Sequence, residues 1–397
     1  MKFKAIIAEF NPFHNGHKHL IDSIKGKDDL IIVIMSSSFT QRGKPGILDK
    51  FTRAKIALNN GADIVLELPS IFSSSSAEIF AKGAVGILNS LDCVDELCFG
   101  AEDKLADLLE IDRKISENEN NSLDNLKFYL SKGLSFLQAR ELSYNFLSSE
   151  ELAMLKKPNN ILAFEYIKAL KATDSEIKAH AIKRYKIDHD SSFAKENFAS
   201  SSYIRKLARA KEYEEIKNLM PRDSYRVLKN KNKVYLNDYL DIFKYKLIND
   251  NINFSDYVDY ENGLENRFYK YIDSKNMEEY IRKISSKRYT HSRISRLISH
   301  ILLDIKKDFI FESYNQPYIR VLASNKRGFD LLKELKKKDI FYIDKFSKIN
   351  DLDENSILKR IALKESQITD SYELFNQNIL NKDYLTNFII KKQELRD

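Results

Sequence analysis

The sequence predicts an α/β protein in which a parallel sheet is followed by a mainly helical region, and two observations carry this prediction. In the first hundred residues, short apolar runs alternate with segments of helical periodicity, as they do in βαβ units. Beyond about residue 225 the alternation stops and helical periodicity dominates. We therefore expect a Rossmann-like parallel-sheet domain at residues 1–225, followed by a mainly helical domain at residues 226–397.

The expected strands of the sheet are short and apolar. The clearest is the run LIIVIM at residues 30–35, because a strand that is covered on both faces needs no polar residue. The others lie at residues 4–9, 64–68, 96–99 and 177–183. Parallel sheets bind ligands at the carboxyl ends of their strands, so we expect a site in the loops that follow these runs.

Helical periodicity marks the segments between and after these strands. In the first half, helices are expected at residues 17–25, 50–59, 77–90, 161–171 and 200–211. In the second half, they are expected at residues 236–248, 263–274, 277–284, 292–307, 328–337 and 356–362. Two apolar runs of the second half, residues 318–323 and 340–343, are expected to be strands of a short α/β piece inside the helical region.

Length, composition and charge exclude several classes of protein. The chain has 397 residues, and its 11 Gly and 6 Pro exclude a fibre or a disordered tail. Two cysteines, Cys93 and Cys98, are too few for a disulfide framework and fit the reduced thiols of a cytoplasmic protein. No apolar run reaches about 18 residues and no C-x₂-C signature is present, so we expect neither a membrane span nor a protein metal site. The formal charge of +7 weakly favours a nucleic-acid partner.

The segment AEFNPFHNGH at residues 8–17 carries the most specific chemical signal. It follows the first expected strand and opens the first helix, where unpaired backbone N–H groups and the helix dipole attract phosphate. His14 and His17 form an H-x-G-H motif, and imidazole N–H groups at this position can stabilise charge that builds on a phosphorus atom. Gly16 allows the backbone and an adenine to approach each other. Two histidines that only cap the helix are the alternative.

An H-x-G-H motif after the first strand is typical of the nucleotidylyltransferase superfamily, and the wider segment resembles the bacterial tRNA(Met) cytidine acetate ligase family. Further segments are similar to that family, at residues 35–43, 49–54, 61–69, 98–102, 158–162, 200–205 and 287–294. Two residues depart from the family pattern, Tyr203 in place of a small residue and Ala163 in place of a frequent glycine. The resemblance extends from residue 4 to about residue 340, and the last fifty or so residues carry no known motif.

The resemblance implies an enzyme that forms N4-acetylcytidine at the wobble position of elongator tRNA(Met) from ATP and free acetate. Acetate attacks the α-phosphate of ATP to give acetyl-adenylate and pyrophosphate, and the cytidine amine then takes the acetyl group while AMP leaves. The resemblance also implies Mg²⁺ bound with ATP, a nucleotidylyltransferase-like ATP-binding catalytic domain at residues 1–225, and tRNA binding by residues 226–397. We expect a cytoplasmic protein, and no protein partner is inferred.

The same resemblance assigns the site residues. Catalysis falls to His14 and His17. The ATP contacts fall on the strand end, the loop, the first helix and several later positions, namely Ile7, Ala8, Glu9, Phe10, Asn11, Pro12, Phe13, His14, Asn15, Gly16, His17, Lys18, His19, Leu20, Gly100, Asn159, Arg184, Ser201 and Arg205. Asn160 competes with Asn159 for the same role. Gln41, Arg42 and Lys50 follow the second expected strand, and acetate, pyrophosphate, tRNA and a solvated loop all remain open for them.

Residues 281–300 are the best candidate for an RNA-binding surface, because they hold six Lys or Arg residues and no acid. Such cations neutralise phosphates, and Tyr289 can stack on an exposed base. If the stretch is one helix, Tyr289, Arg293 and Arg296 share a face. We expect contacts to tRNA from Lys287, Arg288, Arg293 and Arg296. A solvated charged helix is the alternative, and residues 336–338 form a weaker basic patch.

Two other functions fit the same sequence. An adenylyltransferase that acts on a small cofactor precursor needs the loop but not the basic second half. A non-catalytic RNA-binding protein would keep the nucleotide fold, although intact His14 and His17 argue against it. The sequence leaves open the acetate pocket, the base for the cytidine amine, the choice of tRNA, the oligomeric state and the role of the last residues.

Overall fold

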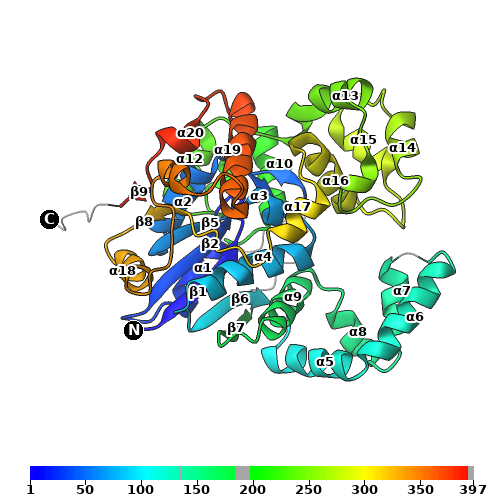
Figure 1. Cartoon of the computed structure of the whole chain (residues 1–397), viewed down its shortest axis with the longest axis horizontal. Helices are drawn as coiled ribbons and strands as arrows, with labels where there is room; N and C mark the ends of the chain where they lie inside the picture. Colours follow the sequence, from blue (N-terminus) through cyan, green and yellow to red (C-terminus); the bar gives the residue numbers. More distant parts are fainter. Residues whose placement is uncertain (135, 184–196, 392–397) are drawn as a thin grey trace.

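The computed structural model describes residues 1–134, 136–183 and 197–391, and seven of its described strands build one large sheet (Figure 1). The strand order is β7-β6-β1-β2-β5-β8-β9. The bounds are β1 Phe3–Ala8, β2 Leu30–Ser36, β5 Ile64–Leu68, β6 Glu96–Ala101, β7 Lys178–Lys183, β8 Val321–Ser324 and β9 Ile389–Ile390. The strands of the first half, β1, β2, β5, β6 and β7, run parallel. The predicted Rossmann-like sheet and its five expected strands are thus confirmed.

Two hydrophobic cores lie on opposite faces of this sheet. On β2, Ile32 and Ile34 belong to one core while Ile31 and Val33 belong to the other, because successive side chains of a strand point to opposite faces. One core is covered by α1 Asn15–Ile24, α2 Lys50–Asn59, α10 Ser201–Ala210, α11 Tyr213–Ile216 and α12 Arg222–Asn230. The other is covered by α3 Ser70–Ser73, α4 Ala77–Ser90, α9 Pro158–Ala172, α17 Lys307–Glu312, α18 Phe329–Lys337 and α19 Ile357–Asn376.

Residues 236–303 form a helical subdomain with a core of its own. Its elements are η1 Leu236–Tyr239, α13 Leu240–Asn249, η2 Phe254–Asp256, α14 Glu265–Lys270, α15 Met277–Ile284 and α16 His291–Leu303. Aromatic rings fill its centre, with Phe268 lying 5.3 Å from Phe254 and 6.1 Å from Tyr280 between centroids. In Figure 1 this subdomain stands beside the sheet body, next to α10 and α17.

A second helical region projects from the sheet body on the side of β6 and β7 (Figure 1). It consists of α5 Leu105–Glu117, α6 Glu119–Ser131, α7 Phe136–Ser143 and α8 Ser149–Met154. Nowhere in the described ranges does a helix combine the length and the apolar character that crossing a bilayer requires.

The chain returns to the sheet after the helical subdomain. Strand β8 pairs antiparallel with β5, and β9 pairs parallel with β8. Short elements of this last part of the chain are η3 Phe346–Asp351 and α20 Lys382–Leu385. A division at residue 225 therefore does not separate the sheet from the second half of the chain. The strand expected at residues 340–343 is not formed, because only Ile343 of that run is buried, and it makes an isolated bridge with Arg320.

Candidate active site

A pocket of about 200 Å³ lies at the carboxyl ends of β1, β6 and β7. The loop after β1, the start of α1 and the start of α10 meet there, together with α9 and a short hairpin that follows β2. The site residues expected from sequence that line it are Ile7, Ala8, Glu9, Phe10, Asn11, His14, Gly16, His17, His19, Leu20, Gly100, Asn159, Ser201 and Arg205. The pocket therefore lies where the sequence predicted a site, at the carboxyl ends of the parallel strands.

His14 and His17 stack on each other at the start of α1, with ring centroids 3.8 Å apart and an interplanar angle of 25°. Nδ1 of His14 accepts the N–H of Gly16 at 3.0 Å, and Nδ1 of His17 accepts the N–H of His14 at 3.2 Å. The two histidines therefore do cap the helix. They also line the pocket, so capping and a ligand-facing position occur together.

This capping determines which nitrogen of each ring donates. Because both Nδ1 atoms accept a backbone N–H, each neutral ring of His14 and His17 carries its proton on Nε2. Both rings are then hydrogen-bond donors at a helix N-terminus, where the dipole already favours negative charge. Such donors suit phosphate oxygens on which charge develops.

Gly16 is required by the motif itself. A Cβ atom on this residue would lie 2.9 Å from Cε1 and 3.0 Å from Nδ1 of His14. The close approach that the sequence predicted at Gly16 is therefore made, first of all, by the imidazole of His14.

Buried contacts hold the loop between β1 and α1 in place. The guanidinium of Arg53, on α2, donates from Nη1 to the carbonyl of Glu9 at 2.7 Å and to that of Ser36 at 2.9 Å. Asn11 Oδ1 accepts the N–H of Ile47 at 2.7 Å. These contacts tie the loop to the segment after β2, so the two loops keep one geometry.

Helix α10 presents a second helix N-terminus to the pocket. Its N-cap is Ser200, whose Oγ accepts the N–H of Tyr203 at 3.1 Å. Ser201 and Arg205 line the pocket, and Arg205 Nη1 donates to the carbonyl of Asn11 at 2.5 Å. Tyr203 packs against the core beside α1 and α2. This geometry is compatible with the expected phosphate contact of Ser201 and Arg205, which stays a prediction.

The outlying ATP residues divide into three cases. Gly100 and Asn159 line the pocket. Asn160 does not, because its buried side chain accepts the N–H of Glu102 at 3.0 Å and thereby links α9 to the end of β6. Of the two competing asparagines, Asn159 is the one at the pocket. Arg184 lies outside the described residues.

Four residues of the expected ATP stretch do not line the pocket, namely Pro12, Phe13, Asn15 and Lys18. Phe13 is buried in the core beside α1. Asn15 Nδ2 donates to the carbonyl of Asn218 at 2.9 Å, and Lys18 pairs with Asp22 along the exposed side of α1. The side chains of Phe13, Asn15 and Lys18 therefore have structural contacts of their own. A contact between these residues and ATP stays a prediction.

A hairpin of β3 Phe39–Thr40 and β4 Lys44–Pro45 forms one wall of the pocket. The sequence does not predict this hairpin, because strands of two residues are too short to show periodicity. It brings Gln41 and Arg42, which the sequence left unassigned, to the pocket together with Thr40 and Lys44. Lys50, the third unassigned residue, is buried elsewhere and forms ion pairs with Glu67 and Asp383.

The charge of the pocket is predominantly positive. Four Lys or Arg residues line it, namely Arg42, Lys44, Lys183 and Arg205. Among the described lining residues, Glu9 is the one carboxylate. Desolvation of the ammonium group and the charges of Arg205 and Arg42 lower the pKa of Lys44. An anionic ligand is therefore the natural occupant of this end of the pocket.

The candidate RNA surface is not one helix. Helix α15 ends at Ile284 and α16 begins at His291. Tyr289 precedes α16, so the helical face expected for Tyr289, Arg293 and Arg296 does not form as such. The guanidinium of Arg293 lies instead over the Tyr289 ring, 5.3 Å from its centroid.

Acidic side chains from residues 259–261 accompany the expected RNA contacts. Arg296 makes a two-pronged ion pair with Asp259 at 2.6 and 2.9 Å. Glu261 pairs with Arg288 and, at 3.4 Å, with Arg293. The stretch 281–300 has no acid of its own, but the tertiary structure brings two acids to it. Lys287 is exposed.

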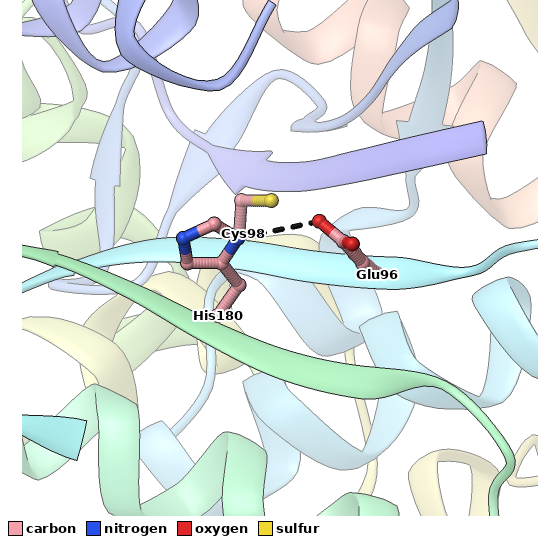
Figure 2. A group of neighbouring side chains, drawn as sticks. All are labelled: Glu96, Cys98 and His180. Carbon is pink, nitrogen blue, oxygen red and sulfur yellow. Dashed lines mark hydrogen bonds and ion pairs between the residues drawn. The ribbon is translucent and has the colours of Figure 1, made fainter. Parts of the chain in front are cut away.

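One described group of three His, Cys, Asp or Glu side chains has spacing that suits a metal, and it lies on β6 and β7 (Figure 2). His180 Nδ1 lies 3.2 Å from Glu96, and the ligand atoms of Glu96, Cys98 and His180 lie within 4.8 Å of one another. Lys2 Nζ already binds Glu96 at 2.6 Å, and Lys4 lies 3.9 Å away. Burial raises the pKa of the Cys98 thiol to about 12. Because two lysines already lie at Glu96 and the thiol of Cys98 stays protonated, the group is an ion-pair cluster and is poorly suited to bind a metal ion.

Comparison with known proteins gives the same picture over almost the whole chain. The family model described as HIGH Nucleotidyl Transferase matches residues 1–387. The tRNA(Met) cytidine acetate ligase of Clostridium perfringens (strain SM101 / Type A) is 38% identical over 98% of this chain and 100% of its own length. That of Caldicellulosiruptor saccharolyticus is 39% identical over 93% of each chain.

Two crystal structures of TmcAL from Thermotoga maritima are similar as well. The apo form matches with a TM-score of 0.91 and 29% identity, and the form bound with alpha-thio ATP matches with a TM-score of 0.86 and 30% identity. Each match covers 98% of this chain and 99% of the other. The sheet, the histidine pair that caps α1 and these full-length relatives agree with the resemblance in the sequence. The chain belongs to the HIGH nucleotidyl transferase family, among the tRNA(Met) cytidine acetate ligases.

Proposed function

We propose that this protein is an ATP-dependent ligase that joins free acetate to the wobble cytidine of elongator tRNA(Met) through acetyl-adenylate. The observation that carries the proposal is the pair of imidazole donors, His14 and His17, held at the N-terminus of α1 in a cationic pocket. The names of its relatives support the choice of tRNA and acetate as substrates.

In the first step, an acetate oxygen attacks the α-phosphorus of ATP and the bond to pyrophosphate breaks. The protein supplies no nucleophile, and its contribution is positioning and charge stabilisation. His14 and His17 donate from Nε2 to phosphate oxygens on which charge builds, while the N-termini of α1 and α10 hold the phosphate chain. Arg42, Lys44 and Arg205 stabilise the departing pyrophosphate.

Mg²⁺ is expected to enter with ATP. Among the described residues that line the pocket, Glu9 is the one carboxylate, which is too few for a protein cage. The phosphates and water would hold the ion, as is usual for Mg²⁺ with nucleotides.

In the second step, the exocyclic amine of cytidine attacks the acetyl carbonyl and AMP leaves. The wobble base is unpaired, so it can leave its stack to reach the adenylate. The helical subdomain supports this step by its position, because Ser299 Oγ on α16 donates to the carbonyl of Gly43 in the hairpin that lines the pocket. An RNA bound along residues 281–300 would lie beside that hairpin. We place the reaction in the cytoplasm, with its tRNA substrate.

One reaction tests the proposal. Purified protein is incubated with ATP, Mg²⁺, labelled acetate and unmodified elongator tRNA(Met), and the nucleosides of the recovered tRNA are read by mass spectrometry. We expect N4-acetylcytidine that requires both ATP and acetate. Acetate-dependent release of pyrophosphate without an acetylated base would retain the first step and reject the acceptor. The absence of both products would reject the ligase and favour a different adenylyltransferase or an RNA-binding protein.

A further inference from the structure

Glu9 differs in charge from the other ionisable residues of the pocket. It is the one carboxylate among the described residues that line the pocket, and four lining residues are Lys or Arg. It is only half-buried, so it remains accessible to a substrate. Burial, and after it the charge of Glu9, raises the pKa of Tyr166, another lining residue.

Glu9 is also held in a defined orientation. Its Oε1 accepts the N–H of Gln41 at 2.8 Å, and its main-chain carbonyl accepts from Arg53 at 2.7 Å. A side chain that is fixed by one carboxylate oxygen presents the other as a base of defined direction. A catalytic base needs such positioning before it needs a particular pKa.

Although Glu9 is among the expected ATP contacts, the negative charge of its carboxylate does not help the first half-reaction. Adenylation builds negative charge on phosphate, and a carboxylate close to that charge opposes it. The histidines cannot replace Glu9 in the second half-reaction, because Nδ1 of His14 and of His17 already accepts a backbone N–H and Nε2 carries the proton. Acyl transfer to an amine, by contrast, requires a proton acceptor.

We propose that Glu9 is the base that accepts the proton of the cytidine amine during acetyl transfer, a role that rests on the proposed function. The N4 nitrogen forms a bond to the acetyl carbonyl carbon, and the bond from that carbon to the AMP oxygen breaks. One N4 proton passes to the Glu9 carboxylate, and AMP leaves with the electron pair of the broken bond. Carboxylates are also the usual acceptors for the N4 amine of cytosine.

The hairpin connects this base to the helical subdomain. Gln41, which orients Glu9, is two residues from Gly43, and Gly43 lies directly against α16. A Cβ on Gly43 would meet the backbone nitrogen of Arg296 at 2.4 Å, and the Gly43 carbonyl accepts from Ser299 at 2.7 Å. The carboxylate is therefore positioned by the same segment that touches the expected RNA-binding helix.

The test separates the two half-reactions in wild type, Glu9→Gln, Glu9→Asp and a control, Glu110→Gln, whose side chain is exposed on α5 and pairs with Arg113. Adenylation is followed by acetate-dependent exchange of labelled pyrophosphate into ATP. Transfer is followed in a single turnover with labelled acetate and unmodified elongator tRNA(Met), over a range of pH. The glutamine retains an oxygen that can accept the Gln41 N–H, and exchange reports that the variant is folded.

We expect Glu9→Gln to lower the transfer rate constant by about 100-fold or more and to lower exchange far less. The rise of the wild-type transfer rate with pH should be absent in Glu9→Gln and partly restored in Glu9→Asp, while Glu110→Gln behaves as wild type. Transfer at the wild-type rate in Glu9→Gln would overturn the assignment and leave the ligase intact. An equal loss of exchange would also overturn it, because Glu9 would then serve ATP or acetate. If the wild type transfers no acetyl group, the ligase proposal itself fails and this role falls with it.

Discussion

Two groups of charged side chains lie at the carboxyl edge of the sheet, and they differ in solvent access and in charge balance. The pocket is open, and its described lining holds four Lys or Arg side chains and one carboxylate, Glu9. The second group, which we call the buried network, has side chains that are each at most 3% exposed. Its members are Lys50, Glu67, Arg320, Glu365 and Asp383.

The buried network satisfies its charges internally. Lys50 Nζ lies 2.5 Å from Glu67 and 2.9 Å from Asp383, and Arg320 lies 2.9 Å from Asp383. Burial opposes the charge of Lys50, but Asp383 and Glu67 outweigh it and raise the pKa of this lysine. Burial, with the charge of Glu67, raises the pKa of Glu365 to about 7. With Glu365 protonated, two cations face two anions.

The difference teaches which charges are available to a ligand. A dry, balanced group has no charge left for a substrate, and its role is to hold α19 and α20 against β5. An open group with excess positive charge can still bind an anionic substrate. The last fifty or so residues, for which the sequence offered no role, thus supply Glu365 and Asp383 to this structural contact.

The largest effect is expected when the balance of the buried network is broken. Lys50→Ala removes one of the two buried cations that pair with Glu67 and Asp383 and leaves an excess negative charge in a dry environment, so we expect the free energy of unfolding to fall by about 3 to 5 kcal/mol. Urea unfolding followed by circular dichroism measures this change. Lys55→Ala, on the exposed side of the same helix, is the control and should change it by less than about 0.5 kcal/mol. Equal effects of the two substitutions would contradict the comparison.

The pocket should respond mainly in activity, although His17 also contributes to the cap of α1. His17→Ala removes one imidazole donor, and we expect acetyl-adenylate formation to fall by about 100- to 1,000-fold, while tRNA binding stays nearly intact. Acetate-dependent pyrophosphate exchange and filter binding of tRNA measure the two properties. His291→Ala, an exposed histidine on α16, is the control for exchange. Unchanged exchange in His17→Ala would remove the proposed role of the loop.

The pH dependence of stability sharpens the distinction. Burial raises the pKa of Glu365 from its ordinary value of 4.5 to about 7 in the folded protein. Its contribution to stability is therefore complete below about pH 4.5 and is lost as the pH rises through 7. Glu365→Gln cannot ionise, and we expect it to gain about 1 to 3 kcal/mol of stability relative to wild type between pH 5 and pH 8. Urea unfolding at both pH values tests this. The same difference between variant and wild type at both values would show that Glu365 does not titrate there.

The RNA surface is an intermediate case, since its arginines are paired but partly exposed. Arg288→Ala combined with Arg293→Ala should weaken tRNA binding by about tenfold and flatten its salt dependence. Glu261→Gln removes the anion that both arginines share and should tighten tRNA binding if they reach phosphates. Filter binding at several salt concentrations measures both changes. Unchanged affinity in both variants would place the RNA surface elsewhere.

The elements that the sequence predicted well are those whose signals are local. Strand β2 is recognisable because its residues are apolar on both faces, and α1 is recognisable because the H-x-G-H motif is contiguous with its start. The loop between β1 and α1 was also predictable from local signals, since His14, Gly16 and His17 make their defining contacts with one another.

The role of Lys50 was out of reach, although it lies in a segment as distinctive as the loop. Its partners Glu67 and Asp383 are 17 and 333 residues away. The same holds for Arg293 and Arg296, whose acidic neighbours lie more than thirty residues earlier, on another loop. A charge run looks solvated in the sequence until the fold brings the opposite charge to it.

The sequence by itself determined the class of the sheet, the motif and the family, because each is written in neighbouring residues. The tertiary structure alone decided which charges remain available to a ligand and that β8 and β9 complete the sheet. It also decided that Glu9 is the one carboxylate among the described residues that line a cationic pocket. The physical reason is that charge balance, burial and strand pairing depend on groups that are adjacent in space and far apart along the chain.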